Sequence, residues 1–231
     1  MSTLACTVLT IWSKFRTSGQ DGDEPTVTGA ARWAQILRHT VDVVVERGYS
    51  GASLNHIAEH VGISKGLISY HFDGKDELLE SLVRDVFDRG AEFVMRRWGK
   101  RVPEDAPPSE ALRIYLEGNL GFIAAHPQDV GAVVEVVRNH RDAGGELVFG
   151  TAWDEALHEE LARIFIAGQE SGEFRQFDPR VMAIAVRRVI DGFTFQIMAH
   201  PDMDTEAFTA EVVALFEHAT RAESPRAEER V

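Results

Sequence analysis

Two histidines and a glutamate stand close together at His56, Glu59 and His60, in the order H-x-x-E-H. Histidines four residues apart share one face of a helix and can bind zinc, and this order occurs in one class of zinc peptidases. A metal-dependent enzyme on a helical scaffold is therefore one alternative. The segment that carries the motif is short, however, and no third ligand is evident. The competing interpretation is two solvated histidines, with His56 near a DNA phosphate, and we expect no metal site and no cofactor.

A second group of polar residues follows directly and is suited to contact a nucleic acid. Lys65 can reach a phosphate, and Gly66 lets the backbone approach the sugar-phosphate chain closely. Lys75 stands where a helix is expected to begin. Its cationic side chain and the free backbone N–H groups of the helix start could therefore bind the same phosphate. Short or planar polar groups for base edges and phosphates come from Ser69, Tyr70 and His71.

Three helical elements must position these residues, and the sequence marks their ends. The first helix is expected from about 29 to 47, and Gly48 ends it as a C-cap. Ser53 and Ser64 can each cap a short helix, the second of them covering about 65–71. Gly62 makes the turn between the two short helices. This order predicts a helix-turn-helix, whose second helix enters the major groove of DNA.

The stretch 48–79 resembles the DNA-binding domain of the TetR family of bacterial transcriptional regulators. The cues are Gly48–Tyr49, the run Val61-Gly62-Ile63-Ser64-Lys65-Gly66, Tyr70–His71–Phe72 and Gly74-Lys75-Asp76-Glu77-Leu78-Leu79. The family commonly has a small β-branched residue in place of Leu67 and an aromatic in place of Ser69, which concerns the DNA sequence preference. The resemblance implies DNA contacts from Ser53, Ser64, Lys65, Gly66, Leu67, Ser69, Tyr70, His71 and Lys75.

Helical spacing of apolar residues continues almost to the end of the chain, which predicts an all-α protein of about nine helices. The later helices are expected from near Gly74 and at about 110–125, 127–141, 152–171, 178–199 and 204–220. We expect a flexible tail over 1–27, a helix-turn-helix domain over 28–76, a helical ligand-binding and dimerisation domain over 77–222, and a second flexible tail over 223–231.

The resemblance also implies that the C-terminal bundle encloses a small-molecule pocket and that the last two helices form a two-fold dimer. Helix 178–199 is apolar on more than one face, as expected for a helix buried on two sides. The predicted dimer residues are Met182, Val189, Phe195, Phe208, Val212, Leu215 and Phe216. The predicted ligand residues are Phe122, Asn139, His140, Trp153, Phe165 and Phe193, and the aromatic members can equally be core residues.

Charge is distributed unevenly along this chain of 231 residues with a formal net charge of −13. Residues 28–101 hold 11 basic and 10 acidic side chains, whereas 102–231 hold 11 and 24. The acidity therefore lies outside the predicted DNA-reading segment, which can present a local basic face. We expect a mainly apolar effector with one or two polar anchors, and an acidic domain favours a cationic effector over an anionic one.

These observations predict a cytoplasmic, ligand-responsive repressor that binds palindromic operator DNA as a homodimer and is not an enzyme. The single cysteine excludes an internal disulfide, and no apolar run reaches the roughly 18 residues of a membrane span. No paired carboxylates, nucleophile motif or phosphate-binding loop is evident in the sequence.

Overall fold

The computed structural model describes residues 27–98 and 106–222, so both predicted tails lie outside it except for Val27. These residues form nine helices and two isolated β-bridges, which confirms the predicted all-α fold. None of the helices in the described ranges is long and apolar enough to cross a bilayer. The helices are α2 (Val27–Gly51), α3 (Leu54–Val61), α4 (Lys65–His71), α5 (Gly74–Trp98), α6 (Pro108–Ala125), α7 (Pro127–Asn139), α8 (Thr151–Glu170), α9 (Pro179–Ala199) and α10 (Thr205–Thr220).

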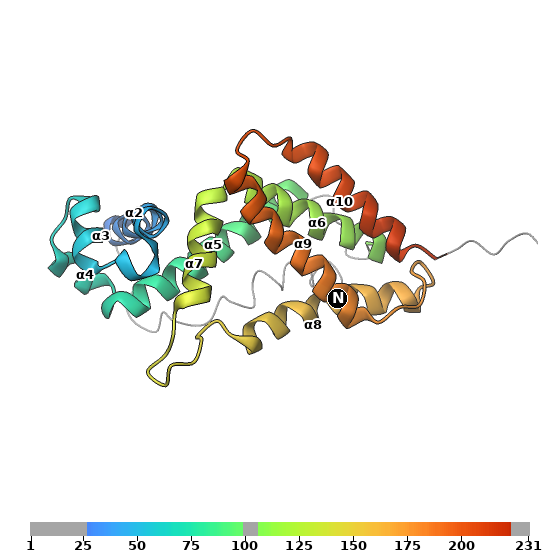
Figure 1. Cartoon of the computed structure of the whole chain (residues 1–231), viewed down its shortest axis with the longest axis horizontal. Helices are drawn as coiled ribbons and strands as arrows, with labels where there is room; N and C mark the ends of the chain where they lie inside the picture. Colours follow the sequence, from blue (N-terminus) through green and yellow to red (C-terminus); the bar gives the residue numbers. More distant parts are fainter. Residues whose placement is uncertain (1–26, 99–105, 223–231) are drawn as a thin grey trace, which may run out of the picture.

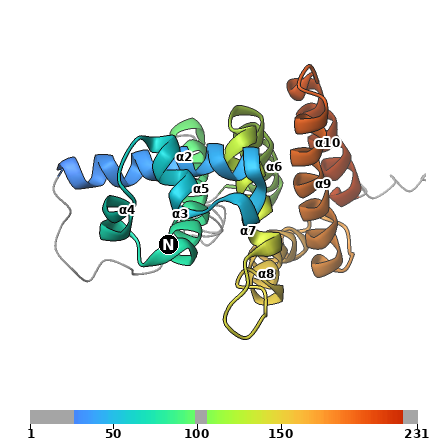
Figure 2. The same cartoon turned by 60° about the vertical axis from the view of Figure 1, so that its left-hand side comes forward.

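Helices α2, α3 and α4 form a head at one end of the molecule, and α9 and α10 lie at the opposite end (Figures 1 and 2). The predicted helix ends and caps of the head are confirmed. Gly48 has φ +69°, a backbone conformation that breaks the α2 helix and that favours glycine. Ser53 accepts a hydrogen bond from the His56 N–H, and Ser64 accepts one from the Leu67 N–H, so both serines cap the helices that follow them.

The head is tied to the rest of the molecule through a shared apolar core. Ile57 of α3, Ile68 of α4 and Phe72, which directly follows α4, are buried under the head. Leu79 and Val83 of α5 are buried with them. The same cluster continues into α7 and reaches the loop before α8. Helix α5 begins in the head and runs into the body (Figure 1), so the predicted boundary at 76–77 falls in its first turn. A displacement of α5 or α7 would therefore also shift the helices of the head.

A second apolar core lies in the body between α6, α8, α9 and α10. Helix α10 packs on α6, and α9 packs on α7 and α8. Tyr115 and Leu120 of α6, Phe165 of α8 and Phe193 of α9 are buried in this cluster. The ring of Phe193 stacks on Phe208 of α10 with centroids 4.7 Å apart.

Gly168 of α8 sits where a side chain cannot be accommodated. A Cβ atom at this position would overlap the ring of Phe174, which is itself buried in the body core. We expect Gly168→Ala to destabilise the fold by about 3 kcal/mol and to lower the thermal midpoint by about 6 to 12 °C. The matched control is Gly131→Ala on α7, whose new Cβ meets only the exposed and flexible thioether of Met198. Equal thermal midpoints for the two variants would contradict this account of packing at Gly168.

Candidate nucleic-acid interface and ligand cavity

The outer face of α4 carries the polar residues that the sequence predicted for DNA. Tyr70 is 82% exposed, the most exposed of the large hydrophobic side chains in the described ranges. Lys65, Gly66 and Ser69 are exposed as well, while Ile68 and Phe72 hold the opposite face in the core. Half-buried positions are taken by Leu67, His71 and Ser53. The short helix therefore presents a polar, partly aromatic face on an apolar base.

Lys75 is engaged within the protein rather than extended into solvent. Its ammonium donates a hydrogen bond of 2.6 Å to the main-chain oxygen of Tyr49 and lies 4.4 Å from the centroid of the Tyr49 ring. Burial lowers the pKa of Lys75, although the nearby carboxylate of Asp76 opposes this shift. An ammonium has three N–H donors, so a phosphate contact still has donors left. Lys75 also holds the last residues of α2 against the start of α5.

Tyr49 and the buried His140 connect the head to the end of α7. The Tyr49 hydroxyl lies 3.0 Å from Nδ1 of His140, and the Tyr49 N–H donates to the carboxylate of Glu135. Nε2 of His140 lies 3.4 Å from the carboxylate of Glu80 on α5. A proton on Nε2 would let His140 donate to Glu80 and accept from the Tyr49 hydroxyl. Head, α5 and α7 therefore meet at one imidazole, which is 1% exposed.

A second polar link joins α5 to α7 nearer the middle of the body. Arg89 of α5 donates to both carboxylate oxygens of Asp129 at 2.9 and 3.1 Å and also donates to Asp85. Burial opposes the charge on Arg89, but its hydrogen bonds and the charges of Asp129 and Asp85 raise its pKa. This paired geometry fixes the relative position of the two helices.

A cavity of about 450 Å³ opens in the body between α5, α6, α7, α8 and α9. This volume lies within the range of small-molecule sites. Most of its wall is apolar, and the aromatic part is contributed by Phe87, Phe122, Phe149, Trp153 and Phe195. The ring of Trp153 contacts Phe87 and Phe149 edge to face, with centroids 5.2 and 5.0 Å apart. The cavity can therefore take an apolar molecule against a rigid aromatic wall.

Charged side chains also line the cavity, and arginines outnumber the carboxylates. Arg187 donates to Asp191 at 2.7 Å and to the Tyr115 hydroxyl, while Arg188 pairs with Asp154 and Asp191. Burial opposes the charge on Arg187, but Tyr115 and Asp191 raise its pKa above its ordinary value.

Arg138 is the third arginine of the lining. Its guanidinium lies 4.7 Å from the centroid of the Phe195 ring, and it forms no ion pair within the described ranges. Three arginines face two aspartates, so the charge at the cavity is positive although the domain as a whole is acidic.

Only two of the six predicted ligand residues, Phe122 and Trp153, line this cavity. Phe165 and Phe193 belong to the body core, which is the competing interpretation that the sequence left open. His140 lies in the link to the head. Asn139 is exposed at the end of α7, where its amide donates to the Glu135 carbonyl. The sequence offered no spacing pattern that could have brought together Phe149, Arg138 and Arg187, which come from separate elements.

The predicted dimer residues also divide between surface and core. Leu215 is 59% exposed and Phe195 is 41% exposed, while Met182 and Val189 are half-buried. Phe195 also lines the cavity. Five of the seven predicted residues pack within or against the subunit's own body core, namely Met182, Val189, Phe208, Val212 and Phe216. Val181, which the sequence analysis did not single out, is 62% exposed on α9.

Residues 36–82 match the family model described as bacterial regulatory proteins, tetR family. This match spans most of α2, all of α3 and α4, and the first turns of α5, which is the head described above. The head belongs to the TetR family. The TetR-family assignment confirms the resemblance seen in the sequence, and it agrees with the expectation that the chain is not an enzyme, because the matched relatives and structures are regulators.

Curated relatives match this chain mainly in its N-terminal part. The chain is 34% identical over 88 residues to the HTH-type transcriptional regulator BetI 1 of Chromohalobacter salexigens, which covers 38% of the chain and 42% of that protein. The BetI regulator of Burkholderia thailandensis is 29% identical over 132 residues, covering 57% of the chain and 58% of that protein. The first of these alignments thus spans less than half the length of the relative.

Solved structures extend the similarity of fold over both the head and the body. A TetR-family regulatory protein from Rhodococcus RHA1 matches with a TM-score of 0.68 and 18% identity, covering 83% of this chain and 98% of that one. The fatty acid degradation regulator FadR from Bacillus halodurans matches with a TM-score of 0.64 and 23% identity, covering 82% and 100%. At these identities the likeness concerns the fold.

Proposed function

We propose that this chain is a homodimeric transcriptional repressor in which α4 reads the major groove of palindromic operator DNA. The exposed polar face of α4, which includes Tyr70, is the observation that carries the proposal. The second helix of a helix-turn-helix contacts base edges, and flanking cations and helix N-termini contact phosphates. A bacterial protein with this partner works in the cytoplasm.

The proposed DNA contacts are those predicted from the sequence, and we propose different tasks for them. Lys65, Ser69 and Tyr70 are exposed and free to reach the groove, whereas Ser53 and Ser64 also cap helices. Gly66 leaves room for the sugar-phosphate chain. Further contacts are proposed for Leu67, His71 and Lys75, with Lys75 also anchoring Tyr49.

A phosphate contact from Lys65 makes a measurable prediction about salt. DNA fragments from upstream of the protein's own gene and a random duplex are titrated by fluorescence anisotropy over a range of salt concentrations. Lys65→Ala should weaken binding to both duplexes and reduce the slope of log affinity against log salt by about one unit. Arg96→Ala on α5 is the matched control, because this exposed cation lies outside the head and should leave the slope unchanged. Absence of binding by the wild type to the upstream fragments would contradict the proposed function itself.

We further propose that the body cavity binds the effector and that the effector releases DNA. The apolar wall supports a mainly apolar effector, as expected from the sequence. The excess of arginine supports an effector whose polar group is acidic rather than cationic. Two structural neighbours are named as regulators of fatty acid metabolism or degradation, which agrees with an acyl chain ending in a carboxylate. Arg138 is the proposed anchor, because it has no carboxylate partner within the described ranges.

The path from cavity to head is proposed to run through Phe149, His140 and Tyr49. Phe149 lines the cavity, and its ring centroid lies 6.1 Å from that of His140. His140 contacts the Tyr49 hydroxyl, and Tyr49 is held by Lys75 at the start of α5. An effector that moves Phe149 or α7 would shift the head, and an effector acts on DNA affinity only if it binds one conformation better than another.

A further inference from the structure

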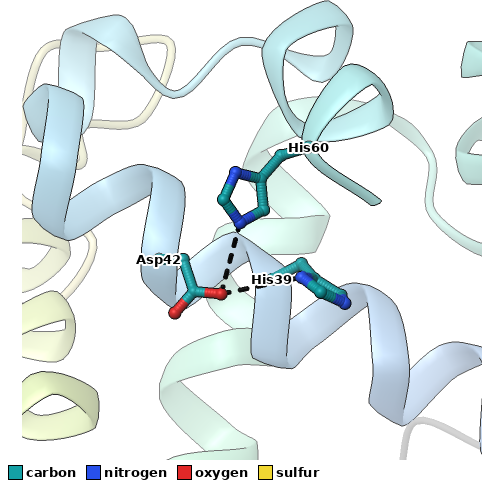
Figure 3. A group of neighbouring side chains, drawn as sticks. All are labelled: His39, Asp42 and His60. Carbon is teal, nitrogen blue, oxygen red and sulfur yellow. Dashed lines mark hydrogen bonds and ion pairs between the residues drawn. The ribbon is translucent and has the colours of Figure 1, made fainter. Parts of the chain in front are cut away.

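The histidines of the predicted zinc-peptidase motif do not act together in the fold. Nδ1 of His56 bonds to the main-chain oxygen of Gly51 at 2.8 Å, which occupies one of its two ring nitrogens. His60 instead extends from α3 toward α2, where its Nε2 lies 3.3 Å from Oδ2 of Asp42 (Figure 3). The alternative built on His56, Glu59 and His60 is thereby replaced by a different set of neighbours.

His39 completes a group of three possible metal ligands with Asp42 and His60. His39 and Asp42 lie one helical turn apart on α2, and Nδ1 of His39 is 3.6 Å from the same Oδ2 of Asp42. One ligand atom from each of the three residues lies within 4.8 Å of the others. In Figure 3 the contacts of His60 and His39 both end at the same carboxylate oxygen of Asp42, on the side of α2 that faces α3.

The spacing of these atoms suits a tetrahedral zinc ion. Metal–ligand bonds of about 2.0 to 2.1 Å place neighbouring ligand atoms about 3.4 Å apart in a tetrahedron. The two contacts to Asp42, at 3.3 and 3.6 Å, are close to this edge length, so small rotations of the side chains would seat the ion. Two imidazoles and one carboxylate favour zinc over magnesium or calcium, which prefer all-oxygen sites.

An unsatisfied polar atom provides a second, independent observation. Nδ1 of His39 is buried and has no hydrogen-bond partner in the described part of the chain. A buried nitrogen without a partner is costly and calls for an explanation. A metal ion bound at this nitrogen would satisfy it, whereas solvated surface histidines would leave no such atom.

We propose that His39, Asp42 and His60 form a zinc site that clamps α3 onto α2 in the head. His60 is 33% exposed on its side chain, so the fourth position of the tetrahedron is open to water. Asp42 and His60 are 18 residues apart in the sequence, and the ion would therefore add a strong link between two elements that already share apolar contacts and two histidine hydrogen bonds. Zinc binding would fix the base from which α4 projects. This site is distinct from the effector cavity, and it does not depend on the proposed function.

The test uses the full chain, freed of metal with a chelator and then titrated with ZnCl₂ by calorimetry. One zinc ion per chain should bind. The thermal midpoint should rise by about 5 to 10 °C at a free zinc concentration about 100 times the dissociation constant. His60→Gln and Asp42→Asn should each weaken zinc binding at least about 10-fold and abolish the thermal shift. Both variants should unfold at nearly the wild-type midpoint without zinc, because both side chains are partly exposed.

Two control variants decide which histidines hold the ion. His218→Gln removes an exposed histidine of α10 and should leave zinc binding unchanged. His56→Gln should also leave it unchanged, since His56 is turned toward Gly51. Equal loss in His56→Gln and His60→Gln would overturn the proposal in favour of the motif read from the sequence. Zinc binding that is unchanged in His60→Gln and Asp42→Asn, or that is absent in the wild type, would overturn it outright.

Discussion

Leu215→Glu should convert the protein from a dimer to a monomer and weaken binding to a palindromic operator at least about 100-fold. Leu215 is 59% exposed in the subunit, so a charge at this position leaves the monomer's own core intact. In a two-fold dimer the same surface meets itself, and each carboxylate would be buried without a partner. A cost of about 3 kcal/mol corresponds to a factor of about 150 in the equilibrium constant.

The measurement is analytical ultracentrifugation at micromolar concentration, followed by operator titration. Two reading helices must lie about 34 Å apart to contact successive half-sites, so a separated monomer loses the second half-site. Val148→Glu is the matched control, since Val148 is an exposed apolar residue in the loop between α7 and α8. A wild type that sediments as a monomer would refute the homodimer. If the Leu215→Glu variant remained a dimer, the dimer interface would not include this face of α10.

The exposed face of α9 and α10 could be identified only in part from the sequence. Helical periodicity shows that α9 and α10 are apolar over much of their surface, but it does not distinguish the subunit's own core from a partner. Phe208 and Phe216 face inward because α10 packs on α6, and this pairing joins segments about 100 residues apart in the sequence. Val181 was passed over because one exposed valine at a helix start carries no periodic signal.

The head could be predicted in far more detail, because its signals are local. Gly48, Ser53 and Ser64 each act within four residues, through a positive φ angle or a cap, and the structure confirms them. Tyr49 was noticed as a family cue, but its contact with His140 joins residues 91 apart and has no counterpart in spacing. His39 was not considered as a ligand for the same reason, since its site depends on how α3 packs on α2.

The net charge of the C-terminal part differs in sign from the charge of the cavity lining. The C-terminal part carries 24 acidic and 11 basic side chains, which favoured a cationic effector. The cavity is lined by three arginines and two aspartates, and both aspartates are already paired with Arg187 and Arg188. A bound ligand responds mainly to the few charges that line its cavity, because solvent and salt screen the more distant charges on the surface.

Dodecanoate should therefore bind the protein more tightly than dodecyltrimethylammonium, a probe with a similar chain and a cationic head. The apolar chain would lie against the aromatic wall, and the carboxylate would accept hydrogen bonds from Arg138. Hydrogen bonds to charged groups contribute about 1.5 to 3 kcal/mol, so Arg138→Gln should weaken dodecanoate binding about 10-fold or more. Arg141→Gln is the control, because Arg141 bonds the Gly145 carbonyl and does not line the cavity. Tighter binding of the cationic probe would refute the proposal that the effector carries an acidic group.

Release of DNA can be separated from binding of the probe with a variant outside the cavity. Tyr49→Phe removes the hydroxyl that contacts His140 and leaves the cavity wall unchanged. Dodecanoate should bind this variant as it binds the wild type, but the factor by which it weakens operator binding should fall about fivefold, the equivalent of one hydrogen bond. Because coupling is reciprocal, operator DNA must weaken dodecanoate binding by the same factor in each protein. A coupling factor that is unchanged in Tyr49→Phe would exclude the path through His140, and unequal factors in the two directions would show that dodecanoate also acts outside the cavity.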